Sequence, residues 1–301
     1  MIEPIIKVTN LTKTFGSKTA VNDLSFEVNP GEIFAFLGAN GSGKTTSIRV
    51  LLNILQATSG TTHINGKVYD DAMASMLGYL PEERGLYLNA RVLETLMYFA
   101  QLKGMESQGS KIAAISYLEK VGLADKANVE IKQLSSGQQQ KIQLGVAIIN
   151  SPELLILDEP TKGLDPVNRE LLMEMLLELN KNGSTVVFIT HQMEEVERIA
   201  SRLVMIKNGK RVLYGGLNEV KASFGNNMIQ LTIEGNLPMS DSLYQIHGIG
   251  NKVEISPKPN ITSDQILKYL VDNNVRILKF EKTVPSLNKI FIKVTEENEE
   301  Q

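Results

Sequence analysis

The chain has 301 residues, of which 42% are apolar and 22% charged, and its formal net charge is only −3. These values are typical of a globular protein with a substantial core, and they argue against nucleic acid as the main partner. Cysteine is absent, which excludes disulfides, thiolate metal sites and cysteine nucleophiles and fits a reducing compartment. We expect no leader peptide, and no stretch approaches the roughly 20 apolar residues of a membrane-spanning helix.

The N-terminal part of the chain is predicted to begin with strands. Residues 5–28 alternate apolar and polar side chains, and Pro30-Gly31 then marks a turn. The apolar run 33–37 predicts a buried strand. It is followed by a glycine-rich loop and by a helix with apolar residues at helical spacing, namely Ile48, Leu51, Leu52 and Leu55. A strand, a glycine-rich loop and a helix in this order open an α/β nucleotide-binding fold.

The middle of the chain is predicted to hold a helical insertion followed by buried strands. Between about residues 86 and 150 the pattern is helical, as in Leu93, Leu96, Met97 and Ala100, and again in Ile112, Ile115, Leu118 and Glu119. Apolar runs return at 154–157, 185–189 and 203–206, with a helix between about 168 and 180. This alternation favours a mostly parallel sheet. Asn208-Gly209 predicts a hairpin that adds an antiparallel strand.

The C-terminal part is predicted to form a second, smaller domain. We expect the boundary near residues 224–227, so that residues 1–224 form the large domain. Alternating segments and two helical stripes between 228 and 295 predict a small α+β domain. The acidic end, 296–301, is expected to be a solvated tail.

The segment between the buried strand and the first helix carries the most specific motif. It reads Gly38-Ala39-Asn40-Gly41-Ser42-Gly43-Lys44-Thr45-Thr46 and matches the P-loop pattern, in which Gly and four further residues precede Gly-Lys-Thr. The glycines let backbone N–H groups turn toward anionic oxygens, and the helix N-terminus adds a favourable dipole. Lys44 would contact the terminal phosphates of a nucleotide, and Thr45 would offer its hydroxyl to Mg²⁺.

Two acidic residues follow the next apolar strand. Asp158 ends the run that starts at Leu154, where a P-loop NTPase holds Mg²⁺ directly or through water. Glu159 comes next, in a position to accept a proton from an attacking water or to orient it. A strand-end acid can also be a mere helix cap or surface charge, but beside the P-loop the pair favours hydrolysis.

Shortly before this strand stands Leu134-Ser135-Ser136-Gly137-Gln138, and with it the set of motifs resembles the ATP-binding subunits of ABC transporters over about residues 5–216. The resemblance implies a P-loop NTPase with a RecA-like core, an antiparallel β subdomain and a helical subdomain. It implies that Ser135, Ser136, Gly137 and Gln138 contact the γ-phosphate of an ATP held by another subunit. Taken alone, Ser135 would be interpreted as an ordinary N-cap.

The resemblance also assigns roles to residues outside these loops. Asp165, in Gly163-Leu164-Asp165, falls in the D-loop, and His191 looks like the switch histidine that contacts the γ-phosphate. Phe15 falls where the family stacks an aromatic ring on adenine, although a phenylalanine among strands is as often part of the core. Glu82 occupies the Q-loop position, beside the expected Mg²⁺.

Three residues depart from the family pattern. Glu82 replaces a glutamine, Ser136 replaces the first glycine of the signature loop, and Lys162 replaces the serine of the D-loop. Glu82 adds a negative charge near the expected metal, whose ligands are predicted to be Thr45, Asp158 and Glu82.

The resemblance implies a function that needs other subunits. The chain has one P-loop and one signature loop, whereas a complete site of the family joins these loops from two subunits, so a homodimer or heterodimer is expected. Transmembrane permease subunits are implied as well, contacted through residues 83–87, with the chain at the cytoplasmic face of the membrane. Similarity to sodium-extrusion and drug-resistance ATPases favours export over import. The transported substrate and the role of the C-terminal domain do not follow.

Two alternative functions are compatible with the P-loop motif alone. An ABC-type ATPase of translation would carry two ATPase domains, and one of DNA repair would carry a long coiled coil, and the sequence shows neither. A purely regulatory nucleotide-binding module is the second alternative. The intact Asp158-Glu159 pair and His191 argue against it, because they predict hydrolysis.

Overall fold

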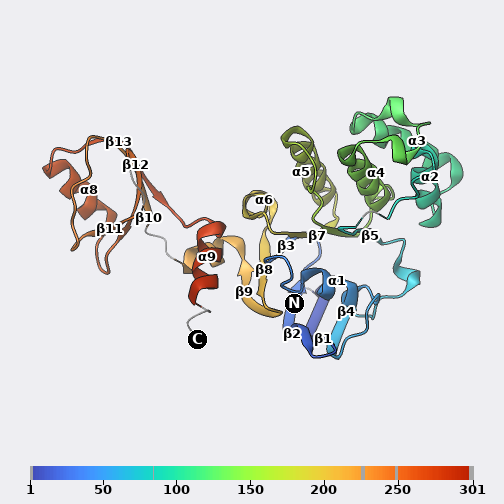
Figure 1. Ribbon diagram of the computed structural model, residues 1–301, viewed down its shortest axis with the longest axis horizontal. Coiled ribbons are helices and arrows are strands. Elements are labelled where there is room, and N and C mark those ends of the chain that lie inside the picture. The colour runs from blue at the N-terminus through green and yellow to red at the C-terminus, as the bar shows by residue number, and fades with distance from the viewer. Residues whose placement is uncertain (1–2, 84, 225–227, 248–249, 298–301) are drawn as a thin grey trace. The chain divides into compact units, whose positions relative to one another are not determined.

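The computed structural model describes residues 3–83, 85–224, 228–247 and 250–297. The chain divides into two compact units, unit 1 (Met1–Gly216) and unit 2 (Leu217–Gln301), drawn in Figure 1. The division precedes the boundary predicted near residue 224, because helix α7 (Leu217–Ser223) groups with unit 2; residues 225–227 lie outside the described residues. In the part of the chain that the structure describes, every helix is too short or too polar to cross a membrane.

Unit 1 is built around a six-stranded sheet of order β5-β6-β7-β3-β8-β9. Its neighbours pair in parallel except β9, which pairs antiparallel with β8 across the Asn208-Gly209 turn, so the predicted sheet and hairpin are confirmed. Every side chain of β3, β6 and β7 is buried, because these strands have both faces covered, and this explains their continuous apolar runs. The strands are β3 (Ile33–Leu37), β5 (Leu77–Leu80), β6 (Leu154–Asp158), β7 (Thr185–Thr190), β8 (Arg202–Lys207) and β9 (Lys210–Gly216).

A second, antiparallel sheet of order β2-β1-β4 packs on the same core. Its strands are β1 (Ile6–Phe15), β2 (Lys18–Val28) and β4 (Ser59–Ile64). Helix α1 (Lys44–Leu51) joins the two sheets, since its Ile48 is buried in one cluster with Leu24 of β2 and Phe36 of β3. This arrangement brings the antiparallel sheet beside the start of α1 (Figure 1).

The helical block contains α2 (Val92–Leu102), α3 (Ser107–Lys120) and α4 (Ser136–Ile148). The helices were predicted here, but the stripe assigned to α3 was partly wrong. Leu118 is buried as predicted, but Ile112 and Ile115 are 63% and 38% exposed, and the rest of the buried face is formed by smaller or polar-tipped residues such as Ala114 and Tyr117. The reason is steric: Gly145 of α4 leaves the space into which the Tyr117 ring fits, and a Cβ there would lie 2.4 Å from it.

The remaining helices of unit 1 are α5 (Pro166–Lys181) and α6 (Met193–Ile199). α5 begins two residues before the predicted start near 168, because Pro166 is compatible with the first helical position and Asp165 caps the helix. Among its described residues, unit 1 also contains the short 3₁₀ turns η1 (Asp71–Met73), η2 (Ala124–Lys126) and η3 (Ile131–Gln133).

Unit 2 has its own core under a four-stranded antiparallel sheet of order β11-β12-β10-β13. The strands are β10 (Met228–Glu234), β11 (Tyr244–His247), β12 (Lys252–Pro257) and β13 (Arg276–Thr283). Helix α8 (Ser263–Asp272) begins at a Thr262 capping box and buries Ile266 and Leu270 in that core. Helix α9 (Leu287–Glu297) buries Leu287 and Ile290. Most of the predicted acidic tail, residues 298–301, lies outside the described residues.

Candidate functional site

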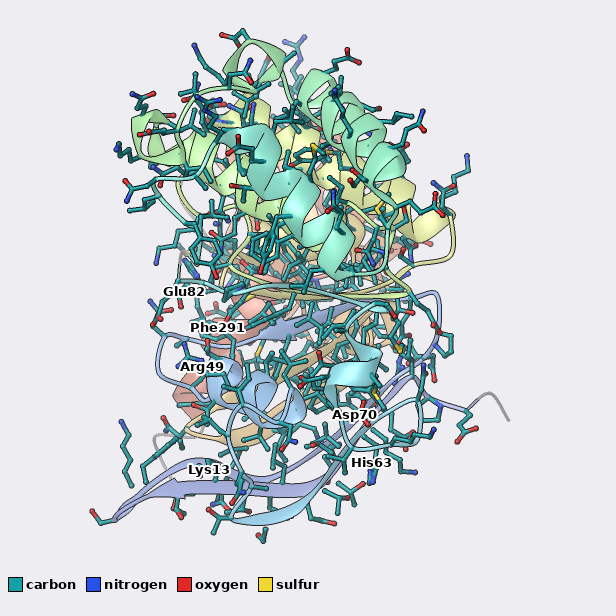
Figure 2. All side chains as sticks on the ribbon, turned by 90° about the vertical axis from the view of Figure 1, so that its right-hand side faces the viewer. Lys13, Arg49, His63, Asp70, Glu82 and Phe291 are labelled. Carbon is teal, nitrogen blue, oxygen red and sulfur yellow. The ribbon has the colours of Figure 1, made fainter. Side chains whose placement is uncertain are left out.

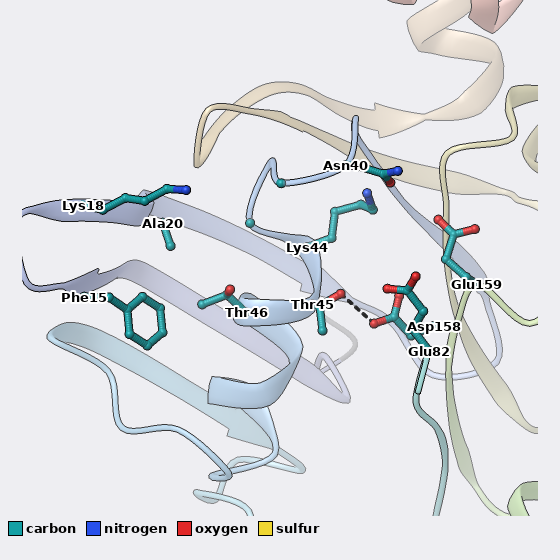
Figure 3. Close-up of a pocket in the computed structure, with 12 residues that line it drawn as sticks. Phe15, Lys18, Ala20, Asn40, Lys44, Thr45, Thr46, Glu82, Asp158 and Glu159 are labelled. Carbon is teal, nitrogen blue, oxygen red and sulfur yellow. Dashed lines mark hydrogen bonds between the residues drawn. The ribbon is translucent and has the colours of Figure 1, made fainter. Parts of the chain in front are cut away.

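A pocket of about 520 Å³ opens in unit 1 beside the N-terminus of α1 (Figure 3). Its walls come from segments far apart in the sequence: the β1–β2 turn region, the loop after β3, the start of α1, and the ends of β5 and β6. Sequence reasoning singled out all of the lining residues except Lys18 and Ala20. They are Phe15, Lys18, Ala20, Asn40, Gly41, Gly43, Lys44, Thr45, Thr46, Glu82, Asp158 and Glu159.

The loop between β3 and α1 approaches β2 so closely that residue 43 has to be glycine. Gly43 has φ +106°, and a Cβ there would lie 2.4 Å from the Ala20 carbonyl oxygen. The loop is held by backbone hydrogen bonds: within the loop the Ser42 N–H donates to the Ala39 carbonyl, and the Ser42 carbonyl accepts from the N–H of Gly209 in the turn between β8 and β9. A tight loop that ends on a helix N-terminus favours an anion, because the first N–H groups of the helix lack partners within the helix.

Lys44 lies inside this loop with only 6% of its surface exposed. Its Nζ donates to the carbonyl oxygens of Gly38, at 2.7 Å, and Ala39, at 3.1 Å. Burial lowers the pKa of Lys44, while the charges of Glu159, Asp158 and Glu82 oppose that shift. The ammonium is therefore held by neutral acceptors, which an anionic oxygen entering the pocket would outcompete.

Asp158 ends β6 and faces α1. Its Oδ2 accepts a hydrogen bond of 2.8 Å from the Thr45 hydroxyl, the dashed line in Figure 3. Burial raises the pKa of Asp158 to about 6; the Thr45 bond opposes the shift, and the charges of Glu82 and Glu159 add to it. The other oxygen, Oδ1, is buried and has no hydrogen-bond partner within the described residues.

Glu159 follows Asp158 and is held by two contacts to the end of β7. Its backbone takes a left-handed φ of +49° while its N–H donates to the Ile189 carbonyl at 2.9 Å. Its Oε1 lies 2.7 Å from Nδ1 of His191, and Oε2 is buried without a partner in the described structure. His191 does not line the pocket itself, but it contacts Glu159, which does. A buried carboxylate oriented by an imidazole has the geometry of a general base with its orienting group.

The oxygen atoms at this end of the pocket fit a hydrated Mg²⁺. This ion prefers oxygen ligands and usually combines one or two protein groups with waters and phosphate oxygens. The buried, unpartnered Oδ1 of Asp158 and the hydroxyl of Thr45 supply such a set. No cluster of three or more metal-binding side chains occurs in the described ranges, so other oxygens would complete the shell. Glu82, the third predicted ligand, also lines the pocket but lies 2.7 Å from the Lys162 ammonium.

Phe15 lies at the far end of the pocket, at the end of β1 (Figure 3). It is 48% exposed, so the alternative that it belongs to the core is wrong. Lys18 pairs with Phe15 across the two-residue Gly16-Ser17 turn and therefore reaches the same pocket. Sequence reasoning missed Lys18, but that turn between alternating segments was a signal that could have found it.

The predicted signature residues Ser135, Ser136, Gly137 and Gln138 lie outside this pocket, at the start of α4. Ser135 Oγ accepts from the Gln138 N–H at 3.3 Å, and the Gln138 side chain accepts from the Ser135 N–H at 2.9 Å. This is a capping box, so the N-cap interpretation describes the contacts of Ser135 within the chain. Ser135 and Ser136 are nevertheless exposed and present the helix N-terminus at the surface.

Asp165 also lies outside the pocket. Its Oδ1 accepts from the Asn168 N–H at 2.9 Å and caps α5, and the hydrogen bonds from Asn168 lower the pKa of Asp165. The residues before it lie against the start of α4, because a Cβ at Gly137 would come within 3.4 Å of the Gly163 carbonyl oxygen. The signature residues and the D-loop thus share one surface, which we call the signature surface.

Comparison with known proteins identifies the family of this chain. A family model described as ABC transporter matches residues 21–162. YhaQ of Bacillus subtilis (strain 168), named an uncharacterized ABC transporter ATP-binding protein, is 38% identical over 291 residues, which cover 96% of this chain and 97% of that protein. The chain belongs to the ABC transporter ATP-binding proteins.

Further comparisons extend this result to unit 2 and to the fold. A model described as the C-terminal domain of DrrA1-3-like ATP-binding proteins matches residues 215–295 of this ABC protein. The linearmycin resistance ATP-binding protein LnrL of Bacillus subtilis (strain 168) is 32% identical, with 97% of this chain and 98% of that protein covered. A solved structure of an ABC transporter ATP-binding subunit matches with TM-score 0.68 and 27% identity, covering 73% of this chain and 93% of that one. The predicted family and P-loop fold are confirmed.

Proposed function

We propose that this ABC protein hydrolyses ATP in the Lys44 pocket and drives transport through separate membrane subunits. The observation that carries the proposal is the state of Glu159: one carboxylate oxygen is fixed 2.7 Å from His191 and the other is buried without a partner in the described structure. Glu159 lines the same pocket as Lys44 and Asp158. A carboxylate in that position can orient a water and accept its proton beside the terminal phosphate.

The other residues that line the pocket each bind a different part of the nucleotide. The buried Lys44 neutralises the terminal phosphates, and the N–H groups at the start of α1 bind their oxygens. The exposed Phe15 ring stacks on adenine. Thr45 and Asp158 would hold Mg²⁺, which when bound supplies charge neutralisation at the phosphate oxygens. His191 keeps the Glu159 carboxylate turned toward the pocket.

The signature surface is proposed to bind a nucleotide that is held by a second ATPase subunit. Ser135 and Ser136 are exposed at a helix N-terminus that does not line the pocket of its own chain. A helix N-terminus can bind phosphate oxygens of a nucleotide held by a neighbour. One chain carries both half-sites, so two copies facing each other would complete two pockets. ATP would hold them together, and hydrolysis would release them.

The membrane partner is proposed to dock on the helical block. Tyr87 and Leu88 are 63% and 50% exposed, and Tyr87 stacks on Phe99 with ring centroids 6.4 Å apart. The sequence also allowed burial of Leu86 and Tyr87 inside the helical block, and the exposure of Tyr87 excludes that alternative for this residue. Adjacent exposed apolar side chains mark an interaction surface, and these follow directly on the Glu82 segment of the pocket. We place the chain at the cytoplasmic face of the membrane. The name of the resistance relative LnrL supports export as the direction.

Two substitutions test the proposed ATPase. Glu159→Gln should lower the rate of ATP hydrolysis about 10²- to 10⁴-fold while leaving ATP affinity nearly unchanged, because it removes the proton acceptor and keeps the shape. Lys44→Ala should instead weaken ATP binding, because it removes the buried cation. Phosphate release and equilibrium ATP binding are measured on the same preparations. Hydrolysis by Glu159→Gln at the rate of the unsubstituted protein would refute the proposal.

A further inference from the structure

Two of the residues that depart from the family pattern contact each other. Glu82 follows β5 and Lys162 follows β6, and the two are 80 residues apart in sequence. Lys162 Nζ nevertheless donates to Glu82 Oε1 at 2.7 Å. The hydrogen bond and the charge of Glu82 raise the pKa of Lys162, and the charges of Glu159 and Asp158 raise it further. Lys162 does not line the pocket itself but is paired with Glu82, a carboxylate that does.

The backbones that carry the pair are held in place from the interior. The Gln143 side chain, buried in α4, donates to the carbonyls of Pro81 and Glu83, each at 3.1 Å. Arg49 of α1 lies 3.6 Å from Glu83, and Figure 2 shows Arg49 and Glu82 on the same side of the molecule. The backbone N–H of Lys162 donates to the Glu159 carbonyl at 3.1 Å. These hydrogen bonds position the two backbone segments that bring the side chains of Glu82 and Lys162 within reach of each other.

The Glu82–Lys162 pair affects the balance of negative and positive charge in the pocket. Glu82 places a third carboxylate beside Asp158 and Glu159, where the usual glutamine would be neutral, and its charge contributes to the raised pKa of Asp158. A nucleoside triphosphate brings several more negative charges into the same space. Without Lys162, the lining lysines Lys44 and Lys18 would face all of these charges, and an uncompensated carboxylate near a phosphate lowers affinity by repulsion.

We propose that Glu82 and Lys162 act as one unit, in which Lys162 is a positioning residue that draws the Glu82 carboxylate to the rim and neutralises it, so that the pocket accepts a nucleoside polyphosphate. The inference rests on the nucleotide-binding function proposed above. It means that serine at position 162 should weaken nucleotide binding when position 82 is glutamate, but not when position 82 is glutamine, as in the family pattern. Both side chains are partly exposed, 64% for Lys162 and 41% for Glu82, so the effect is modest in size.

A double-mutant cycle on the full-length protein tests this coupling. Lys162→Ser, Glu82→Gln and the double variant are compared with the unsubstituted protein by equilibrium binding of ATP, once in EDTA and once with Mg²⁺. Lys162→Ser should weaken ATP binding in EDTA roughly threefold to tenfold, the range of a partly exposed charge. In the Glu82→Gln background the same substitution should change the affinity less than about twofold, because no carboxylate remains to be neutralised. Raising the salt concentration should reduce the effect of Lys162→Ser.

The Lys120–Glu178 pair provides a matched control, since it is a partly exposed ion pair between two helices, α3 and α5, outside the pocket. Lys120→Ser should leave ATP affinity unchanged in either background. A loss from Lys162→Ser of equal size with Glu82 and with Gln at position 82 would overturn the inference, and so would no loss at all. Failure of the unsubstituted protein to bind ATP would instead refute the proposed function, so the two failures are distinguishable.

Discussion

Replacing Asp158 with Asn is expected to stabilise the protein although it removes a proposed Mg²⁺ ligand. Burial raises the pKa of Asp158 from 3.8 to about 6. Each pKa unit corresponds to about 1.4 kcal/mol, so keeping Asp158 ionised at neutral pH costs the folded state about 3 kcal/mol. Asparagine carries no charge and its oxygen can still accept the Thr45 hydrogen bond. Its NH₂ group would replace the unpartnered Oδ1 at a cost of ~1 kcal/mol, which leaves a net gain of about 1–3 kcal/mol.

The pH dependence distinguishes this cause from a general packing effect. Below about pH 4 Asp158 is protonated in both the folded and the unfolded state, so its charge costs nothing. Between about pH 4 and 6 the unfolded chain ionises while the folded one keeps its proton. The free energy of unfolding contributed by Asp158 therefore falls as the pH rises through this window. The advantage of Asp158→Asn should be small near pH 4 and reach its full size above pH 6.

The assay is denaturant unfolding followed by circular dichroism, at two pH values on either side of this window, without nucleotide and with EDTA. Asp165→Asn is the matched control, because the Asp165 carboxylate caps α5 and its pKa is lowered by Asn168. That variant should lose stability at neutral pH, which is the opposite sign. An Asp158→Asn protein that is no more stable than the unsubstituted one at neutral pH would refute the reasoning.

Three further outcomes follow from the same structure. Phe15→Ala should weaken ATP binding by about 1–3 kcal/mol but leave inorganic triphosphate binding unchanged, and an equal loss for both ligands would contradict adenine stacking. The chain has no cysteine, so Tyr87→Cys should crosslink to a membrane subunit in native membranes, whereas Ile112→Cys, at an equally exposed position, should not. Gly145→Ala should lower the free energy of unfolding by about 1–3 kcal/mol, because its Cβ has no space, while Gly109→Ala, with nothing within 4 Å, should not lower it.

The parts of the site that could be predicted are those that the sequence specifies locally. The P-loop is continuous in sequence, and the position of Asp158 follows from a strand that is apolar throughout because both of its faces are covered. A helix start such as Ser135 is also local, since its cap and its partner Gln138 are three residues apart. For the same reason the strand-and-hairpin order of unit 1 could be predicted from short patterns.

The parts that could not be predicted depend on pairing between distant segments. Nothing at Glu82 or Lys162 alone indicates a partner 80 residues away, because their contact is created by the pairing of β5 with β6. The helical pattern placed Ile112 and Ile115 on the buried face of α3 with Leu118, yet only Leu118 of these is buried, because the space above Gly145 on another helix accepts the Tyr117 ring. Lys18 lies at the pocket because the strand pairing at the Gly16-Ser17 turn places it opposite Phe15.

The central claim is that each chain holds one nucleotide in the Lys44 pocket and offers its signature surface to the nucleotide of a second copy. Light scattering on the Glu159→Gln variant tests it most directly, because that variant should bind ATP without consuming it. The account predicts a particle of twice the chain mass of 33.3 kDa with ATP and Mg²⁺, and single chains when Ser135 is replaced by Arg. Single chains of Glu159→Gln with ATP demonstrably bound would contradict it.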